Sequence, residues 1–146
     1  MKILVFGGSG KIGPAVAYDL VHQEDVERVG LAGRREKSLA STRDWIGSDK
    51  IAIHPLDIHD VGACADLMAQ YDIGVSALPD RNTSYRMADT AVKHGLHFVE
   101  MLEEYHRRPD AYEVEGLELP KGMTLDEYGD YLHETAIKND VTFLDG

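Results

Sequence analysis

Short runs of apolar residues alternate along the chain with segments whose apolar positions recur at helical spacing. The run from Lys2 to Phe6 is continuous and ends at glycines, which is typical of a strand buried in a parallel sheet. The segment from Lys11 to His22 has apolar residues three and four positions apart and predicts an amphipathic helix. The pattern predicts strands over residues 2–6, 28–32, 50–56, 73–78, 96–100 and 141–144. It predicts helices over residues 11–22, 36–46, 61–70, 84–93 and 124–139.

This alternation predicts a doubly wound α/β fold, in which a parallel sheet of about six strands carries helices on both faces. It is interrupted over residues 101–123, where Pro109, Gly116, Pro120 and Gly122 leave no strong periodicity. A connection of this length is either a functional lid or contact arm or a poorly ordered insert. We therefore expect one domain over residues 1–146, with an irregular insert at about 101–123.

A glycine motif between the first strand and the first helix predicts that a dinucleotide binds there. Gly8, Gly10 and Gly13 have the spacing Gly-x-Gly-x-x-Gly that Rossmann-type folds place at this turn. The first glycine would permit the tight turn, the second would let the backbone approach a pyrophosphate, and the third would let helix and strand pack closely. The alternative is a structural turn that binds no nucleotide. The residues predicted to bind the phosphates are Gly8, Ser9, Gly10, Lys11, Ile12 and Gly13.

The end of the second predicted strand indicates which dinucleotide binds. NAD-binding domains place an Asp or Glu about 20 residues after the glycine motif, where it contacts the adenosine ribose. Here Gly33 stands at that place and is followed by Arg34 and Arg35. A carboxylate would repel a 2′-phosphate, whereas two guanidiniums can pair with one. The sequence therefore favours NADP as cofactor, with NAD the alternative if the arginines are only surface charge.

Two further loops follow the third and fourth predicted strands, at the edge where ligands bind in open α/β sheets. Asp57 and Ile58 would flank an adenine, and Asp57 is able to accept a hydrogen bond from its exocyclic amine. Alternatively, Asp57 caps the third predicted helix and Asn82 caps the fourth. The residues expected to contact pyrophosphate, ribose or nicotinamide after the fourth strand are Ala77, Leu78, Pro79 and Asn82.

Composition and charge restrict the partners. The chain carries 15 Lys+Arg against 26 Asp+Glu, a net charge of −11, which disfavours a nucleic-acid surface. Residues 1–99 hold 13 acids and 11 bases, whereas residues 100–146 hold 13 acids and 4 bases, so the acid is concentrated after the fifth predicted strand. No run approaches the ~18 to 20 apolar residues of a membrane helix. We expect a cytoplasmic protein without membrane contact.

No combination of side chains predicts a catalytic centre, so the catalytic residues stay unassigned. No Tyr is followed four positions later by Lys, so the acid–base pair of short-chain dehydrogenases is absent. The seven histidines do not form a convincing set of metal ligands, and no metal site is expected. Cys64 lies within the third predicted helix and is expected to be a small core residue.

Four strings of the sequence together resemble the amino-terminal domain of the saccharopine dehydrogenase family: GGSGKIG, VSALP with Asn82, AVKHGLHFVE and NDVTFLDG. The resemblance covers the chain apart from the insert. It implies an NAD(P)-dependent oxidoreductase that acts at a carbon–nitrogen bond of an amino acid or related amine. Such families continue into a second domain that supplies much of the amino-acid pocket. We therefore expect the cofactor-binding part of a larger enzyme, without its substrate domain and inactive alone.

Other functions remain open. A non-catalytic domain could sense the redox state of the dinucleotide through a partner protein, with the insert as the docking element. A short-chain-type reductase is a weaker alternative because the Tyr/Lys pair is absent. The expected ligands are the dinucleotide and, in the full enzyme, a small amino-acid or amine substrate; self-association into a homo-oligomer is left open. The insert carries four acidic residues, which either bind a cationic amine substrate or are solvent-exposed surface charges. They are Glu103, Glu104, Asp110 and Glu113.

Overall fold

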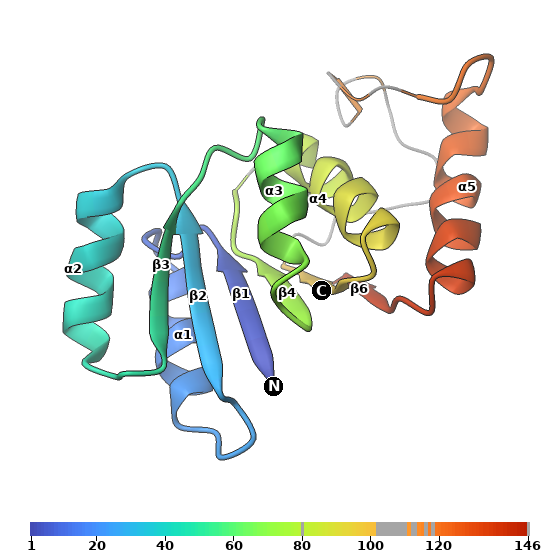
Figure 1. Cartoon of the computed structure of the whole chain (residues 1–146). Coiled ribbons are helices and arrows are strands. Elements are labelled where there is room, and N and C mark those ends of the chain that lie inside the picture. The colour runs from blue at the N-terminus through green and yellow to red at the C-terminus, as the bar shows by residue number, and fades with distance from the viewer. Residues whose placement is uncertain (80, 102–110, 112–113, 116, 118, 146) are drawn as a thin grey trace.

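The computed structural model describes the chain except residues 80, 102–110, 112–113, 116, 118 and 146 and the side chains of residues 81, 82, 84 and 145. Strands and helices alternate along it (Figure 1). The strands are β1 (Lys2–Phe6), β2 (Arg28–Gly33), β3 (Ile51–Pro55), β4 (Ile73–Ser76), β5 (His97–Glu100) and β6 (Phe143–Asp145). The helices are α1 (Gly13–Val21), α2 (Glu36–Ile46), α3 (Val61–Met68), α4 (Arg81–Lys93) and α5 (Leu125–Lys138).

The strands form one parallel sheet in the order β3-β2-β1-β4-β5-β6. Strands β2 and β3 extend the sheet on one side of β1, and β4, β5 and β6 extend it on the other side, so the strand order reverses between β1 and β4. At their carboxyl ends, Phe6 of β1 pairs with Ala32 of β2 on one side and with Ser76 of β4 on the other. The loops after β1, β2, β3 and β4 therefore meet at one edge, at the switch point where open α/β sheets bind ligands. The predicted doubly wound fold is confirmed.

The two faces of the sheet pack against different helices because successive side chains of a strand point to opposite faces. Ile3 and Val5 of β1 belong to a buried cluster that includes residues of α1 and α2. Leu4 and Phe6 belong to a second cluster with residues of α3 and α4. Helices thus cover both faces, as Figure 1 shows. None of the described helices is long and apolar enough to cross a bilayer.

Helix α5 packs beside α4 and begins at a capping box. Tyr128 is buried in a third apolar cluster with Tyr85 of α4, and its hydroxyl donates to Asp89 Oδ1 at 2.9 Å. Thr124 and Glu127 cap the helix: each side chain accepts a hydrogen bond from the other residue's backbone N–H. The predicted insert, including Glu103, Glu104, Asp110 and Glu113, lies mostly outside the described residues.

Two helix starts differ from the predicted ones by more than one residue. Helix α1 begins at Gly13, not at Lys11, because the intervening residues belong to the glycine turn. Helix α4 begins at Arg81, three residues before the predicted start, so Asn82 lies in its first turn. Strand β4 ends at Ser76, which leaves Ala77 to Pro79 as a loop.

Candidate functional site

The turn after β1 is tight because Gly7 adopts a φ of +76°, a conformation that favours glycine. The N–H of Gly10 donates to the carbonyl of Gly7 at 2.9 Å and closes the turn. The turn glycine is therefore Gly7, which precedes the predicted one. Gly8 instead allows close packing, since a Cβ there would lie 2.7 Å from Cβ of Leu31 in β2.

The amino end of α1 abuts this turn and presents free donors. A Cβ on Gly13 would collide with the carbonyl oxygen of Gly7, so the close approach predicted for this glycine is confirmed. The cap residue, Ile12, has no capping side chain. Among the described residues, the backbone N–H groups of Ser9, Lys11 and Ile12 have no hydrogen-bond partner. Unpaired N–H groups and the positive end of the helix dipole suit a phosphate group.

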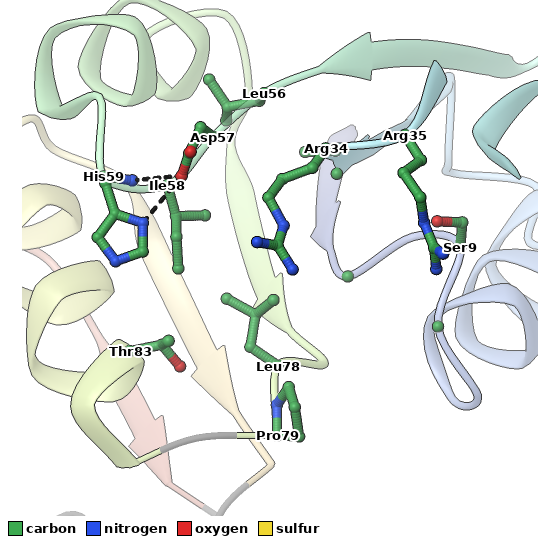
Figure 2. A pocket seen from close by; sticks show the side chains of 14 residues that line it. Ser9, Arg34, Arg35, Leu56, Asp57, Ile58, His59, Leu78, Pro79 and Thr83 are labelled. Carbon is green, nitrogen blue, oxygen red and sulfur yellow. Dashed lines mark hydrogen bonds and ion pairs between the residues drawn. The ribbon is translucent and has the colours of Figure 1, made fainter. Parts of the chain in front are cut away.

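A cleft of about 450 Å³ opens beside the turn, along the carboxyl ends of β1 to β4 (Figure 2). Every loop predicted to bind the dinucleotide contributes to it. Its walls are formed by Gly7, Ser9, Gly10, Ala32, Gly33, Arg34, Arg35, Leu56, Asp57, Ile58, His59, Leu78, Pro79 and Thr83. Gly8, Lys11, Ile12, Gly13 and Ala77 do not line the cleft. The side chain of Asn82 lies outside the described part of the chain.

The two arginines extend from the end of β2 in different directions. In Figure 2, Arg34 points into the cleft toward the loops after β3 and β4, whereas Arg35 points toward the glycine turn. Both side chains are exposed, and neither forms an ion pair or hydrogen bond with another described residue. A Cβ on Gly33 would find Ser9 Oγ 3.8 Å away, so the end of β2 and the glycine turn are neighbours. The guanidiniums are thus free to meet an anionic ligand.

The loop after β3 carries a paired carboxylate and imidazole. Asp57 Oδ1 accepts hydrogen bonds from the backbone N–H of His59 at 3.0 Å and from its Nδ1 at 2.9 Å. These bonds to His59, with a smaller contribution from the charge of Arg34, hold the pKa of Asp57 below its ordinary value. Asp60, not Asp57, caps α3 by accepting from the N–H of Ala63 at 3.0 Å. The alternative of Asp57 as a helix cap is therefore wrong.

Apolar side chains form the floor of the cleft between these charged groups. Leu56 is 8% exposed, and its N–H donates to the carbonyl of Gly33 at 3.0 Å, which joins the loop after β3 to the end of β2. Ile58 and Leu78 pack against the core cluster beneath α3 and α4. An apolar slot flanked by a guanidinium and a carboxylate can hold a flat heterocycle that carries an anionic substituent.

Some residues of the cleft were not singled out from the sequence. Gly7 and Ala32 line it, although the motif alone pointed to the glycines that follow. His59 also lines it, and its contact with Asp57 depends on a local turn that no motif marks. The adjacent Gly7-Gly8 pair was the one signal that could have identified the turn glycine.

Neither a metal site nor a reactive cysteine thiol is found in the described residues. No cluster of three or more His, Cys, Asp or Glu side chains there could hold a metal ion. Cys64 is fully buried in α3, as predicted for a core residue, and burial raises the pKa of its thiol to about 11. What the described residues offer is a binding surface: donors at α1, cations at β2 and an apolar slot.

The sheet order, the glycine turn at its switch point and the adjoining cleft define a Rossmann-type dinucleotide-binding domain. The family model for the saccharopine dehydrogenase NADP binding domain matches residues 3–143. The chain therefore belongs to this family. The family and the class of domain predicted from the sequence are both confirmed.

Solved structures share the fold at low sequence identity. Apo saccharopine dehydrogenase (L-Glu forming) from Saccharomyces cerevisiae matches with a TM-score of 0.70 and 19% identity, over 99% of this chain and 26% of that chain. GenD2 from gentamicin A biosynthesis, in complex with NAD, matches with a TM-score of 0.65 and 18% identity, over 100% of this chain and 34% of that chain. AtPrR2 with NADP⁺ and (+)pinoresinol matches with a TM-score of 0.58 and 16% identity, over 99% of this chain and 49% of that chain. The chain thus spans about a quarter of the yeast enzyme it matches.

Proposed function

We propose that this domain binds NADP(H) in the cleft at the switch point and serves a larger oxidoreductase as its cofactor-binding part. The observation that carries the proposal is the end of β2, where Gly33 stands in place of the carboxylate of an NAD-binding domain and is followed by Arg34 and Arg35. Family membership supports the choice of cofactor. The proposed cofactor residues are Gly8, Ser9, Gly10, Lys11, Ile12, Gly13, Gly33, Arg34, Arg35, Asp57, Ile58, Ala77, Leu78, Pro79 and Asn82.

Each part of the site has a role that follows from its chemistry. The free N–H groups at the start of α1 would bind the pyrophosphate, and the tight packing of Gly8 and Gly13 would hold those donors in place. Arg34 and Arg35 would pair with the 2′-phosphate, because guanidiniums form strong charge-assisted hydrogen bonds with phosphate. Leu78 and Pro79, after β4, would direct the nicotinamide end. When bound, the nicotinamide supplies hydride transfer, and the chain orients it.

The reaction we propose is oxidation or reduction at a carbon–nitrogen bond of an amino acid or related amine. The resemblance to saccharopine dehydrogenases supports it, and this chain covers 26% of such an enzyme. The substrate pocket would then come mainly from another part of the complete protein. With the complete protein, NADPH should be consumed when an amino acid and a carbonyl compound are supplied together. Equal consumption with the carbonyl compound alone would contradict chemistry at a carbon–nitrogen bond.

Calorimetry with NADPH and NADH tests the cofactor assignment. We expect the domain to prefer NADPH by at least about 10-fold, because each charge-assisted hydrogen bond contributes about 1.5–3 kcal/mol. The double substitution Arg34→Ala and Arg35→Ala should abolish this preference while changing the affinity for NADH little. Arg43→Ala is the matched control, since Arg43 is an exposed arginine of α2 that pairs with Asp44. Equal affinities for the two cofactors, unchanged in the double variant, would refute the assignment.

A further inference from the structure

The turn after β3 holds the carboxylate of Asp57 in one orientation. Oδ1 accepts from both the backbone N–H and the Nδ1 of His59, at 3.0 and 2.9 Å. The carbonyl of Asp57 also accepts from the N–H of Asp60 at 3.0 Å, which closes the loop. Within the described residues, Oδ2 accepts no hydrogen bond. One oxygen of the carboxylate is thus occupied, and the other is left to a ligand.

This carboxylate lies at the edge of the apolar slot in the cleft. Leu56, Ile58 and Leu78 line the slot with Asp57 and His59, and Arg34 reaches toward it from β2 (Figure 2). A purine fits such a site, since its faces are flat and weakly polar while its edge carries hydrogen-bonding groups. Adenine presents an amino group at that edge, and a carboxylate oxygen is a strong acceptor for it.

We propose that His59 is a positioning residue that holds Asp57 so that its second oxygen recognises the amino group of the adenine ring. This inference rests on the proposed function, since it assigns the base selectivity of the same cofactor site. His59 would act through Asp57 and would not need to contact the adenine itself.

The surroundings explain why the carboxylate needs a holding partner. The side chain of Asp57 is 56% exposed and that of His59 is 66% exposed, so packing alone does not fix the carboxylate. The guanidinium of Arg34 is close enough for its charge to favour the ionised form of Asp57. Without the imidazole, the carboxylate could turn toward Arg34 and pair with it. Such a pair would withdraw Asp57 from the adenine and Arg34 from the 2′-phosphate.

The test compares NADPH with its hypoxanthine analogue, reduced nicotinamide hypoxanthine dinucleotide phosphate. The analogue replaces the amino donor by a carbonyl acceptor, which would face the Asp57 carboxylate unfavourably. We expect this protein to bind NADPH about 10-fold more tightly than the analogue, the low end for a hydrogen bond to a charged group because Asp57 is half exposed. The ratio of the two dissociation constants is the readout, because a merely structural change would weaken both ligands alike.

Three substitutions make the test specific. His59→Ala should reduce the ratio to about 3-fold or less. His59→Asn should keep most of it, because the asparagine amide can donate to Oδ1 from nearly the same place as Nδ1. His94→Ala, at an exposed histidine after α4, should leave the ratio unchanged. Melting temperatures of all variants should stay close together, since His59 is exposed.

Several outcomes would overturn the inference. They are a ratio near one in the unsubstituted protein, a ratio that His59→Ala leaves unchanged, and an equal loss in His59→Ala and His59→Asn. The proposed function fails differently, because NADPH itself would then bind no more tightly than NADH. The two failures are therefore distinguishable in one set of titrations.

Discussion

Replacing Gly13 by alanine tests how closely α1 must approach the glycine turn. The added Cβ would collide with the carbonyl oxygen of Gly7 and would lie 2.9 Å from the carbonyl carbon of Gly7 and 3.0 Å from Cα of Gly8. All of these are backbone atoms and cannot rotate away, so the helix must retreat from the turn. Overpacking of this kind costs about 1–3 kcal/mol. The shift would also displace the N–H donors, and losing one or two hydrogen bonds to phosphate should weaken NADPH binding by about 10- to 100-fold.

Gly62→Ala is the matched control, since Gly62 also lies in the first turn of a helix, α3. A Cβ there would have only Asp60 Oδ1 within contact distance, at an ordinary 3.6 Å. Alanine should therefore stabilise the protein, by about 0.4–1 kcal/mol. Thermal unfolding should place the two variants about 5–15 °C apart. Calorimetry should show weaker NADPH binding for Gly13→Ala alone. If Gly13→Ala had the same melting temperature and the same affinity for NADPH as Gly62→Ala, the close approach of α1 to the glycine turn would be refuted.

Three further predictions concern helix capping, a close contact and a buried thiol. Thr124→Ala should destabilise the protein by about 1 kcal/mol in urea titrations. Hydrogen bonds from Thr124 lower the pKa of Glu127 below its ordinary value of 4.5. The contribution of this cap to the free energy of unfolding should therefore be complete above pH 4.5 and be lost as the pH falls through the lowered pKa. Gly30→Ala should cost about 1–3 kcal/mol because its Cβ would meet the Tyr71 hydroxyl, and adding Tyr71→Phe should recover part of the loss. Cys64 should resist iodoacetamide at pH 8 until the protein unfolds, because its pKa is raised to about 11; rapid labelling of the folded protein would contradict its burial.

The order of strands and helices was predictable because each buried element has its own periodicity. The run from Ile3 to Phe6 is continuously apolar, since β1 is covered on both faces by helices. The helix starts were less predictable. Ile12 fits the apolar spacing of α1, yet the helix cannot include it as an interior residue because the chain is still leaving the glycine turn. Periodicity marks which face is buried and says less about where a helix begins.

The candidate site was predictable where a residue's role depends on its place in a strand–loop–helix unit. Arg34 and Arg35 follow β2 directly, so the topology alone brings them to the switch point. The role of His59 was not predictable, because it depends on a turn that brings its Nδ1 to Asp57. The choice of Asp60 as the cap of α3 likewise depends on the backbone path of that loop.

The sequence by itself determined the parallel sheet, the glycine turn and the glycine that replaces a carboxylate at the end of β2, because these depend on periodicity and on position along the chain. Only the tertiary structure decided that Gly7 makes the turn, that Arg34 and Arg35 diverge, and that His59 leaves one oxygen of Asp57 free. The reason is physical. A φ angle, a side-chain direction and the partner of a carboxylate are set by neighbours that the fold brings together from separate strands and loops.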